Sequence, residues 1–254
     1  GTFTSGSQTW KYYYWGHYNA NQDTTISGSL SIVYGTAQAN VYIIAGGGGC
    51  GQAIYSNYSN NRASCGGGAG GVVRYNNFPL VAGTYEIVAG GAGSCGVNAY
   101  SPNFVTSGSN GFNSYIKLPN NATFTPFTSS YIIAYGGGAG AAAYSDTVGY
   151  PNEYEAGKQG GSNGGSSQVI SGSYKDVGDT LGATEGGLNS IRQGNRSGTI
   201  SANPGPAVNW RLGCVATGGG GAGTSSLSII GVSGYPYFDN NGATNGGDGI
   251  PVSY

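Results

Sequence analysis

The chain has 254 residues and is nearly uncharged, since 9 lysines and arginines face 10 aspartates and glutamates for a formal net charge of -1. The nine basic residues are scattered, which excludes a nucleic-acid-binding protein because such a protein needs a basic stripe to neutralise phosphates. No segment approaches the roughly 18 consecutive apolar residues that cross a bilayer as a helix, so no membrane span is expected.

Residues 1–28 form an aromatic segment ahead of the rest of the chain. Its centre, Trp10 to Tyr18, contains two of the tryptophans and the single histidine, His17. One histidine with no partner motif nearby does not favour a Ser-His-Asp triad, so we expect no enzyme and assign no catalytic residue. We expect an attachment or interface segment instead, with these contact residues: Trp10, Tyr12, Tyr14 and Trp15.

A repeat of about 44 residues runs through residues 29–254, which we expect to form one glycine-rich β domain. Short apolar runs lead into glycine tracts that begin at residues 46, 90, 136 and 218. The first two steps are nearly equal and the last is close to two steps. Each unit therefore reads as a short strand, a glycine tract and a polar insert.

Beta-branched and aromatic runs bounded by Gly, Asn and Pro predict the strands. Glycine, with 52 residues in the chain, costs a helix about 1 kcal/mol at each position, so an all-β fold is expected. The predicted strands are 29–34, 41–45, 71–75, 84–89, 113–118, 130–135, 213–217, 226–232 and 250–254.

The glycine tracts themselves can be ordered elements. A run without side chains can adopt the extended three-residue helix of the polyproline II type. Glycine keeps its N–H and has no Cβ, so such helices can pack closely and hydrogen-bond sideways. We expect glycine helices that form a sandwich between short strands; the alternative is that the tracts are plain loops.

Four cysteines allow three pairings: Cys50, Cys65, Cys95 and Cys214. None has the C-x-x-C spacing of a zinc or redox motif, so two disulfides in an oxidising compartment are expected. A bond between Cys50 and Cys65 would close the base of the insert between them. Buried free thiols are the alternative.

No cofactor and no metal is expected. The tract from Gly46 to Gly51 is not followed by the Lys-Ser/Thr pair of a phosphate-binding loop. The run from Asp239 to Asp248 matches no known calcium-loop spacing, and its Asn-Gly steps are typical of turns.

The polar inserts carry the candidate binding residues. They combine Tyr with Asn, Ser and Gly, which is the composition of antibody paratopes, where stiff amphipathic rings and adaptable hydrogen bonds make contacts. The alternative is that these rings pack against one another or against neighbouring subunits. The expected ligand-binding residues are Tyr55, Asn57, Tyr58, Asn60, Tyr144, Tyr150, Tyr154, Tyr235 and Tyr237. Asn57, Asn121 and Asn195 also begin N-x-S/T triplets, which are glycan acceptors only in a eukaryotic secretory context.

The order of motifs resembles the glycine-rich domain of phage tail-fibre adhesins and related viral or bacterial surface proteins. The matching runs are Ala45 to Gly49, Cys65 to Tyr75, Pro79 to Ser94, Gly108 to Lys117, Ala134 to Gly140 and Gly247 to Tyr254. The resemblance implies a host-recognition tip whose core is a sandwich of glycine helices and whose variable loops contact the receptor. It also implies an oligomer, in particular a trimer, or docking on a fibre stalk.

Two functions follow as expectations. The first is adhesion: the Tyr/Asn inserts recognise a host-cell glycan or an outer-surface protein. The second is structural: the chain is a coat, filament or envelope subunit whose aromatic residues are buried between protomers. Because intracellular proteins usually carry more charge for solubility, both readings place the chain outside the cell or on a virion or cell surface.

Overall fold

A computed structural model gives the structure of the chain, and the parts that it describes fall into ranges separated by gaps. The longer ranges hold the N-terminal hairpin, the main sheet and the glycine tracts. The described residues are 1–5, 7–16, 25–55, 61–96, 103–119, 130–145, 153–154, 157–165, 167–169, 194, 200–201, 214–216 and 229–230.

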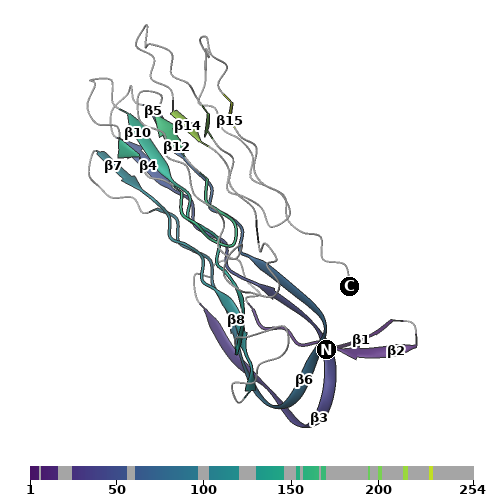
Figure 1. Ribbon diagram of the computed structural model, residues 1–254. Helices are drawn as coiled ribbons and strands as arrows, with labels where there is room; N and C mark the ends of the chain where they lie inside the picture. The colour runs from purple at the N-terminus through teal and green to yellow at the C-terminus, as the bar shows by residue number, and fades with distance from the viewer. Residues whose placement is uncertain are drawn as a thin grey trace.

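Two short strands open the chain as a hairpin, β1 (Thr2–Ser5) and β2 (Gln8–Lys11). They pair antiparallel, with Thr2 opposite Lys11 and Phe3 opposite Trp10. The hairpin stands apart from the main body in Figure 1.

The main sheet has four antiparallel strands in the order β3-β6-β8-β9. Two of them are long, β3 (Ile26–Ile44) and β6 (Val72–Ala89). The other two are short, β8 (Ser114–Lys117) and β9 (Tyr131–Ala134). Their beta-branched and aromatic residues favour the pleated backbone.

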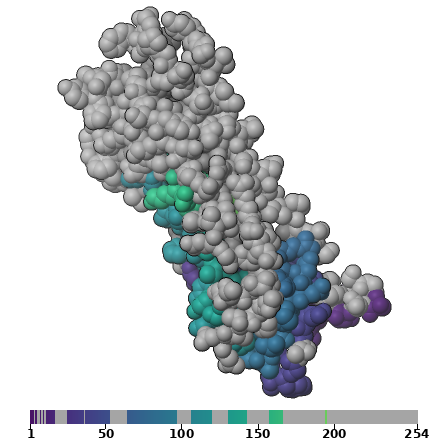
Figure 2. All heavy atoms as spheres, in the orientation of Figure 1, coloured from purple at the N-terminus to yellow at the C-terminus, as the bar shows by residue number. Residues whose placement is uncertain are grey.

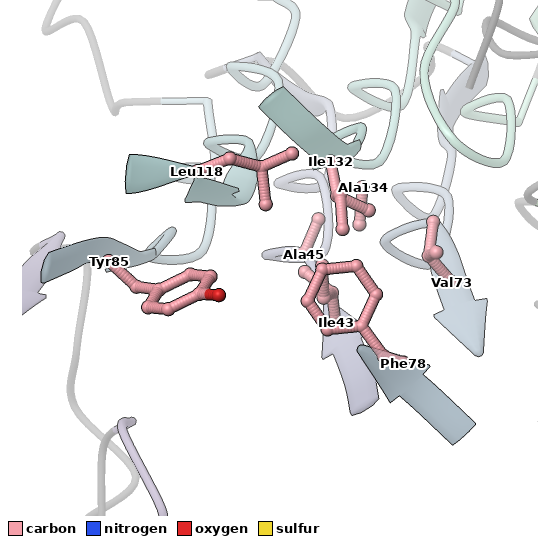
Figure 3. Close-up of a cluster of buried hydrophobic side chains, with 8 residues drawn as sticks. All are labelled: Ile43, Ala45, Val73, Phe78, Tyr85, Leu118, Ile132 and Ala134. Carbon is pink, nitrogen blue, oxygen red and sulfur yellow. The ribbon is translucent and has the colours of Figure 1, made fainter. Parts of the chain in front are cut away.

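One hydrophobic cluster forms the core of this sheet, and all its members are nearly inaccessible to water. Figure 3 shows Phe78 among Ile43, Ala45 and Ile132, with Val73 on one side and Tyr85 and Leu118 on the other. The residues come from β3, β6 and β9 and from the segment after β8. Their burial ties the two long strands to the short ones. The full cluster is Ile43, Ala45, Val73, Phe78, Tyr85, Leu118, Ile132 and Ala134.

The two long strands bend because their pairing shifts register twice. Between Ile32 and Thr36, three residues of β3 face only one residue of β6, and Gly35 has a positive φ of 83°. The second shift lies beside Asn77, whose φ is 57°. Asn40 Oδ1 accepts a hydrogen bond from Asn77 N at 3.1 Å and so supports that conformation.

The glycine tracts between the sheet and the far strands share a hydrogen-bond pattern that repeats every third residue. The N–H groups of Ala45, Gly48 and Gly51 donate to the carbonyls of Gly71, Gly68 and Cys65 at 2.9–3.0 Å. The intervening N–H groups of the same segment, on Gly46 and Gly49, donate to Phe112 and Ser109. Two antiparallel neighbours are thus bound in alternation.

The same segment also binds two parallel neighbours through its carbonyls. Gly47 and Cys50 accept from Gly93 and Gly96, each at 2.8 Å. Gly46 and Gly49 accept from Gly137 and Gly140. Segment 45–51 therefore has four hydrogen-bonded neighbours, whereas a strand in a sheet has two, because its N–H and C=O groups alternate in one plane.

Short strands continue the tracts at the far end of the molecule (Figure 1). One pair is β4 (Gln52–Tyr55) with β7 (Asn103–Thr106). A three-stranded sheet joins β5 (Asn61–Ser64), β10 (Ala142–Ser145) and β11 (Glu153–Tyr154). The remaining pairs are β12 (Ser167–Val169) with β14 (Cys214–Ala216), antiparallel, and β13 (Ile200–Ser201) with β15 (Ile229–Ile230), parallel.

The described residues confirm a strand-rich chain with almost no helix and a mainly antiparallel sheet. The predicted strand boundaries need correction in two places, because 29–34 and 41–45 are parts of β3, and 71–75 and 84–89 are parts of β6. The predicted strand 250–254 lies outside the described residues. In Figure 2 the atoms of β3 and β6 form the surface at the end of the molecule that carries the N-terminal hairpin.

Candidate functional site

Three predicted binding residues lie in the strands at the far end. Tyr55 is the last residue of β4, and Tyr144 and Tyr154 lie in β10 and β11. In the three-stranded sheet Tyr144 is opposite Arg62, and Tyr154 is opposite Ala143. Strand β4 lies next to β5 and β10, so these tyrosines belong to one cluster of strands.

The same strands bracket two of the inserts. Strand β4 ends at Tyr55 and β5 begins at Asn61, on either side of Asn57, Tyr58 and Asn60. Strand β10 ends at Ser145 and β11 begins at Glu153, on either side of Tyr150. The bracketed residues, together with Tyr235 and Tyr237, lie outside the described part of the chain. Both inserts nevertheless start and finish in the same strand cluster.

Packing of the glycine tracts brings β4 and β10 together. The tracts that lead into them run parallel, because the N–H groups of Gly137 and Gly140 donate to Gly46 and Gly49. The approach is so close that a Cβ on Gly51 would collide with the carbonyl of Ala141. Two strands that leave parallel, contacting tracts must emerge side by side, so the tracts decide where the first and third inserts begin.

The predicted interface segment divides into exposed and packed residues. Tyr12 and Tyr14 are exposed, and so is Tyr13 between them, at 62% of its surface. Trp15 is half-buried: its ring lies against Gly28 of β3 and stacks with Tyr13 at 5.9 Å between ring centres. Trp10 pairs with Phe3 through its backbone. Trp15 thus anchors the segment to β3 while the three tyrosines face solvent.

Two exposed apolar residues at this end were not predicted. Val33 and Tyr34 are 83% and 87% exposed because they occupy the register shift of β3, where three residues face one. In a regular strand one of two neighbouring side chains would point to the core. Nothing in the sequence but Gly35 signals this shift, since a lone glycine in a strand often marks a bulge.

The cysteines are placed differently from the expected arrangement. Cys50, Cys65 and Cys95 are free thiols, and the expected bond between Cys50 and Cys65 is not present. Adjacent residues of the tract face different neighbours: Gly51 N donates to Cys65 O, whereas Cys50 O accepts from Gly96 N. The Cys50 thiol is hydrogen-bonded to that of Cys95; burial, and next this bond, raise the pKa of Cys50 to about 11. Cys214 is the first residue of β14.

Two further observations concern only the described ranges. Within them, no three His, Cys, Asp or Glu side chains lie close enough together to hold a metal ion. Within the same ranges, no helix has the length and apolar character needed to cross a bilayer.

Comparison with known proteins gives one family. A model of the family described as "Glycine-rich domain" matches residues 23–252. No curated protein and no solved structure matches the chain significantly. Since the match covers nearly the whole sequence, including the repeats, the hydrogen-bonded tracts and the strands that continue them, the chain belongs to the glycine-rich domain family.

Proposed function

We propose that the chain is an adhesion or receptor-binding domain at the tip of a fibre or on the surface of a virion or cell. One observation supports it above the others. The strands that bracket the Tyr/Asn inserts gather at one end, and the exposed aromatic hairpin segment lies at the opposite end (Figure 1). A tip domain needs this polarity, with attachment at one end and recognition at the other.

The chemistry of the inserts fits a glycan or an outer-surface protein as the ligand. Tyrosine rings provide broad apolar faces with few rotatable bonds, and asparagine provides both donors and acceptors. Sugars present the same combination, with C–H faces above and hydroxyl groups at the rim. A polar surface with few charges binds such ligands without requiring a charged partner.

We further propose that the tracts are polyglycine helices packed as a lattice. Hydrogen bonds at every third residue and four bonded neighbours around segment 45–51 support this, because a three-residue helix points successive groups in three directions. Such a lattice is a stiff spacer, which limits the entropy lost when the inserts bind.

A structural role is the second candidate. Three consecutive exposed tyrosines, with Val33 and Tyr34 at the same end, form an aromatic surface of the kind that subunit interfaces bury. In a coat or filament this surface would contact neighbouring protomers. In the adhesin it contacts a stalk or two further copies in a trimer.

The two candidates separate in a cell-binding assay. Tyr55, Tyr58, Tyr150 and Tyr237 are changed singly to alanine, with Tyr13→Ala at the opposite end as the matched control. Binding of labelled protein to candidate host cells is measured by flow cytometry, together with the melting temperature. The adhesin predicts a loss of about 30-fold or more for at least one insert variant, as for an interface hot spot, at unchanged melting temperature.

The control decides between the candidates. Tyr13→Ala retains cell binding if the inserts are the recognition surface. If all four insert variants bind as the wild type does, or if only assembly is lost, the adhesin proposal is wrong and the structural role is favoured.

A further inference from the structure

Two cysteines lie on neighbouring glycine tracts whose register is set by backbone hydrogen bonds. Gly93 N donates to Gly47 O and Gly96 N donates to Cys50 O, each at 2.8 Å. Both partners advance by three residues in the same direction, so the two tracts run parallel and in step. This register places the Cys95–Gly96 peptide directly beside Cys50.

The side chains meet as the register requires. The thiols of Cys50 and Cys95 share a hydrogen bond. Chains joined by such backbone bonds lie about 4.8 Å apart, which is within the range of about 4.4–6.8 Å between the Cα atoms of disulfide-bonded residues. A bond between these sulfurs therefore needs rotation of side chains but no shift of backbone.

Access differs between the two thiols. Cys95 is exposed, whereas Cys50 is half-buried between tracts. Cys65, in contrast, is buried in the lattice with only 1% of its surface exposed. Only one thiol of the close pair is thus open to a reagent from solution, and the other stands ready as its resolving partner.

We propose that Cys50 and Cys95 form a disulfide that joins the two parallel tracts when the protein meets a small oxidised disulfide such as oxidised glutathione. The Cys95 thiolate attacks one sulfur of glutathione disulfide, and one glutathione thiolate leaves. The Cys50 thiolate then attacks the Cys95 sulfur and releases the second glutathione. The two cysteines lose two protons and two electrons, and one glutathione disulfide becomes two thiols.

The position of this bond gives it a structural role at the base of the inserts. Cys50 lies two residues before β4, which leads to the first insert. The bond would hold β4 to the second tract at that point. The inference does not depend on what the inserts bind, so it stands or falls apart from the proposed function.

Peptide mapping tests the pairing directly. Trypsin cleaves after Lys11, Arg62, Arg74, Lys117 and Arg211, which places the four cysteines in four separate peptides: 12–62, 63–74, 75–117 and 212–254. The full chain is incubated with oxidised glutathione in its native state, alkylated, unfolded and digested. We expect a linked pair of peptides 12–62 and 75–117. Peptides 12–62 and 75–117 that stay alkylated after oxidation, or a link between 12–62 and 63–74, would overturn the proposal.

A thermal measurement provides the second readout, with Cys95→Ala as the matched variant because Cys95 is exposed. For a closed loop of this length, reduction of the oxidised wild type should lower its melting temperature by about 10 °C. Cys95→Ala, treated in the same way, should show no comparable change on reduction. An equal shift in both proteins would assign the effect to another pair and overturn the proposal.

Discussion

The hydroxyl of Tyr85 occupies the one polar position in an otherwise apolar cluster. The residue is 1% exposed, and its oxygen accepts a hydrogen bond from Val81 N at 2.8 Å and donates to Val81 O at 3.2 Å. Both bonds lie within one strand, β6, four residues apart. They hold the strand near the first register shift, where the regular ladder is interrupted.

Tyr85→Phe should lower the free energy of unfolding by about 1–3 kcal/mol, because both backbone groups of Val81 lose a partner. The variant also removes a titration. Burial raises the pKa of Tyr85, so the folded chain holds this proton more tightly than the unfolded chain, where the pKa is about 10. Its contribution is complete below that value and is lost as the pH rises through the folded pKa.

Urea denaturation at about pH 8 and about pH 11 measures both effects. The gap in stability between wild type and Tyr85→Phe should narrow as the pH rises, since only the wild type has this phenol to ionise. A gap that stays constant or widens would contradict the assigned role of the buried hydroxyl.

The glycine tract is an element whose neighbouring positions tolerate side chains differently. A Cβ on Gly48 would collide with the carbonyl of Gly138, whereas the nearest atom to a Cβ on Gly47 is Gly68 O at 3.6 Å, an ordinary contact. The difference arises because successive residues face different neighbours. The two glycines are therefore a matched pair within one tract.

Gly48→Ala should lower the free energy of unfolding by about 1–3 kcal/mol, as overpacking does in a close-packed interior. Gly47→Ala should leave it unchanged or raise it by up to about 1 kcal/mol, because alanine restricts the unfolded chain. Chemical denaturation of both variants checks this. Equal effects would show that the tract does not pack in the register described.

At the scale of the whole molecule, the aromatic segment and the strand cluster lie at opposite ends (Figure 1). If Tyr12, Tyr13 and Tyr14 form the attachment surface, their joint change to serine should convert an oligomer into a monomer in native mass spectrometry. The change should leave the melting temperature of the monomer unchanged, because these rings are exposed.

The double change of Val33 and Tyr34 to serine is the matched control, since these residues are equally exposed but belong to β3. It tests whether any exposed apolar residue at this end suffices. A wild-type chain that is itself monomeric at micromolar concentration would contradict the oligomer proposed for this surface.

Local patterns in the sequence were enough to predict a strand-rich chain with glycine tracts between short apolar runs. Glycine excludes helix by its own backbone entropy, and beta-branched runs favour strands, so neither prediction needs a partner. The same local reasoning divided β3 and β6 too finely. Gly35, Asn40 and Asn77 were read as turn residues, whereas in the structure they lie at register shifts inside continuous strands.

Tertiary structure alone decided which segments became neighbours. Cys50 and Cys65 are close in sequence, yet Cys50 meets Cys95, because each residue of a tract faces a different neighbour among four. Likewise β4 and β10 emerge together only because the tracts before them pack in parallel. The physical reason is that a glycine has no side chain to encode its neighbour, so the choice of partner depends on the packing of the whole lattice.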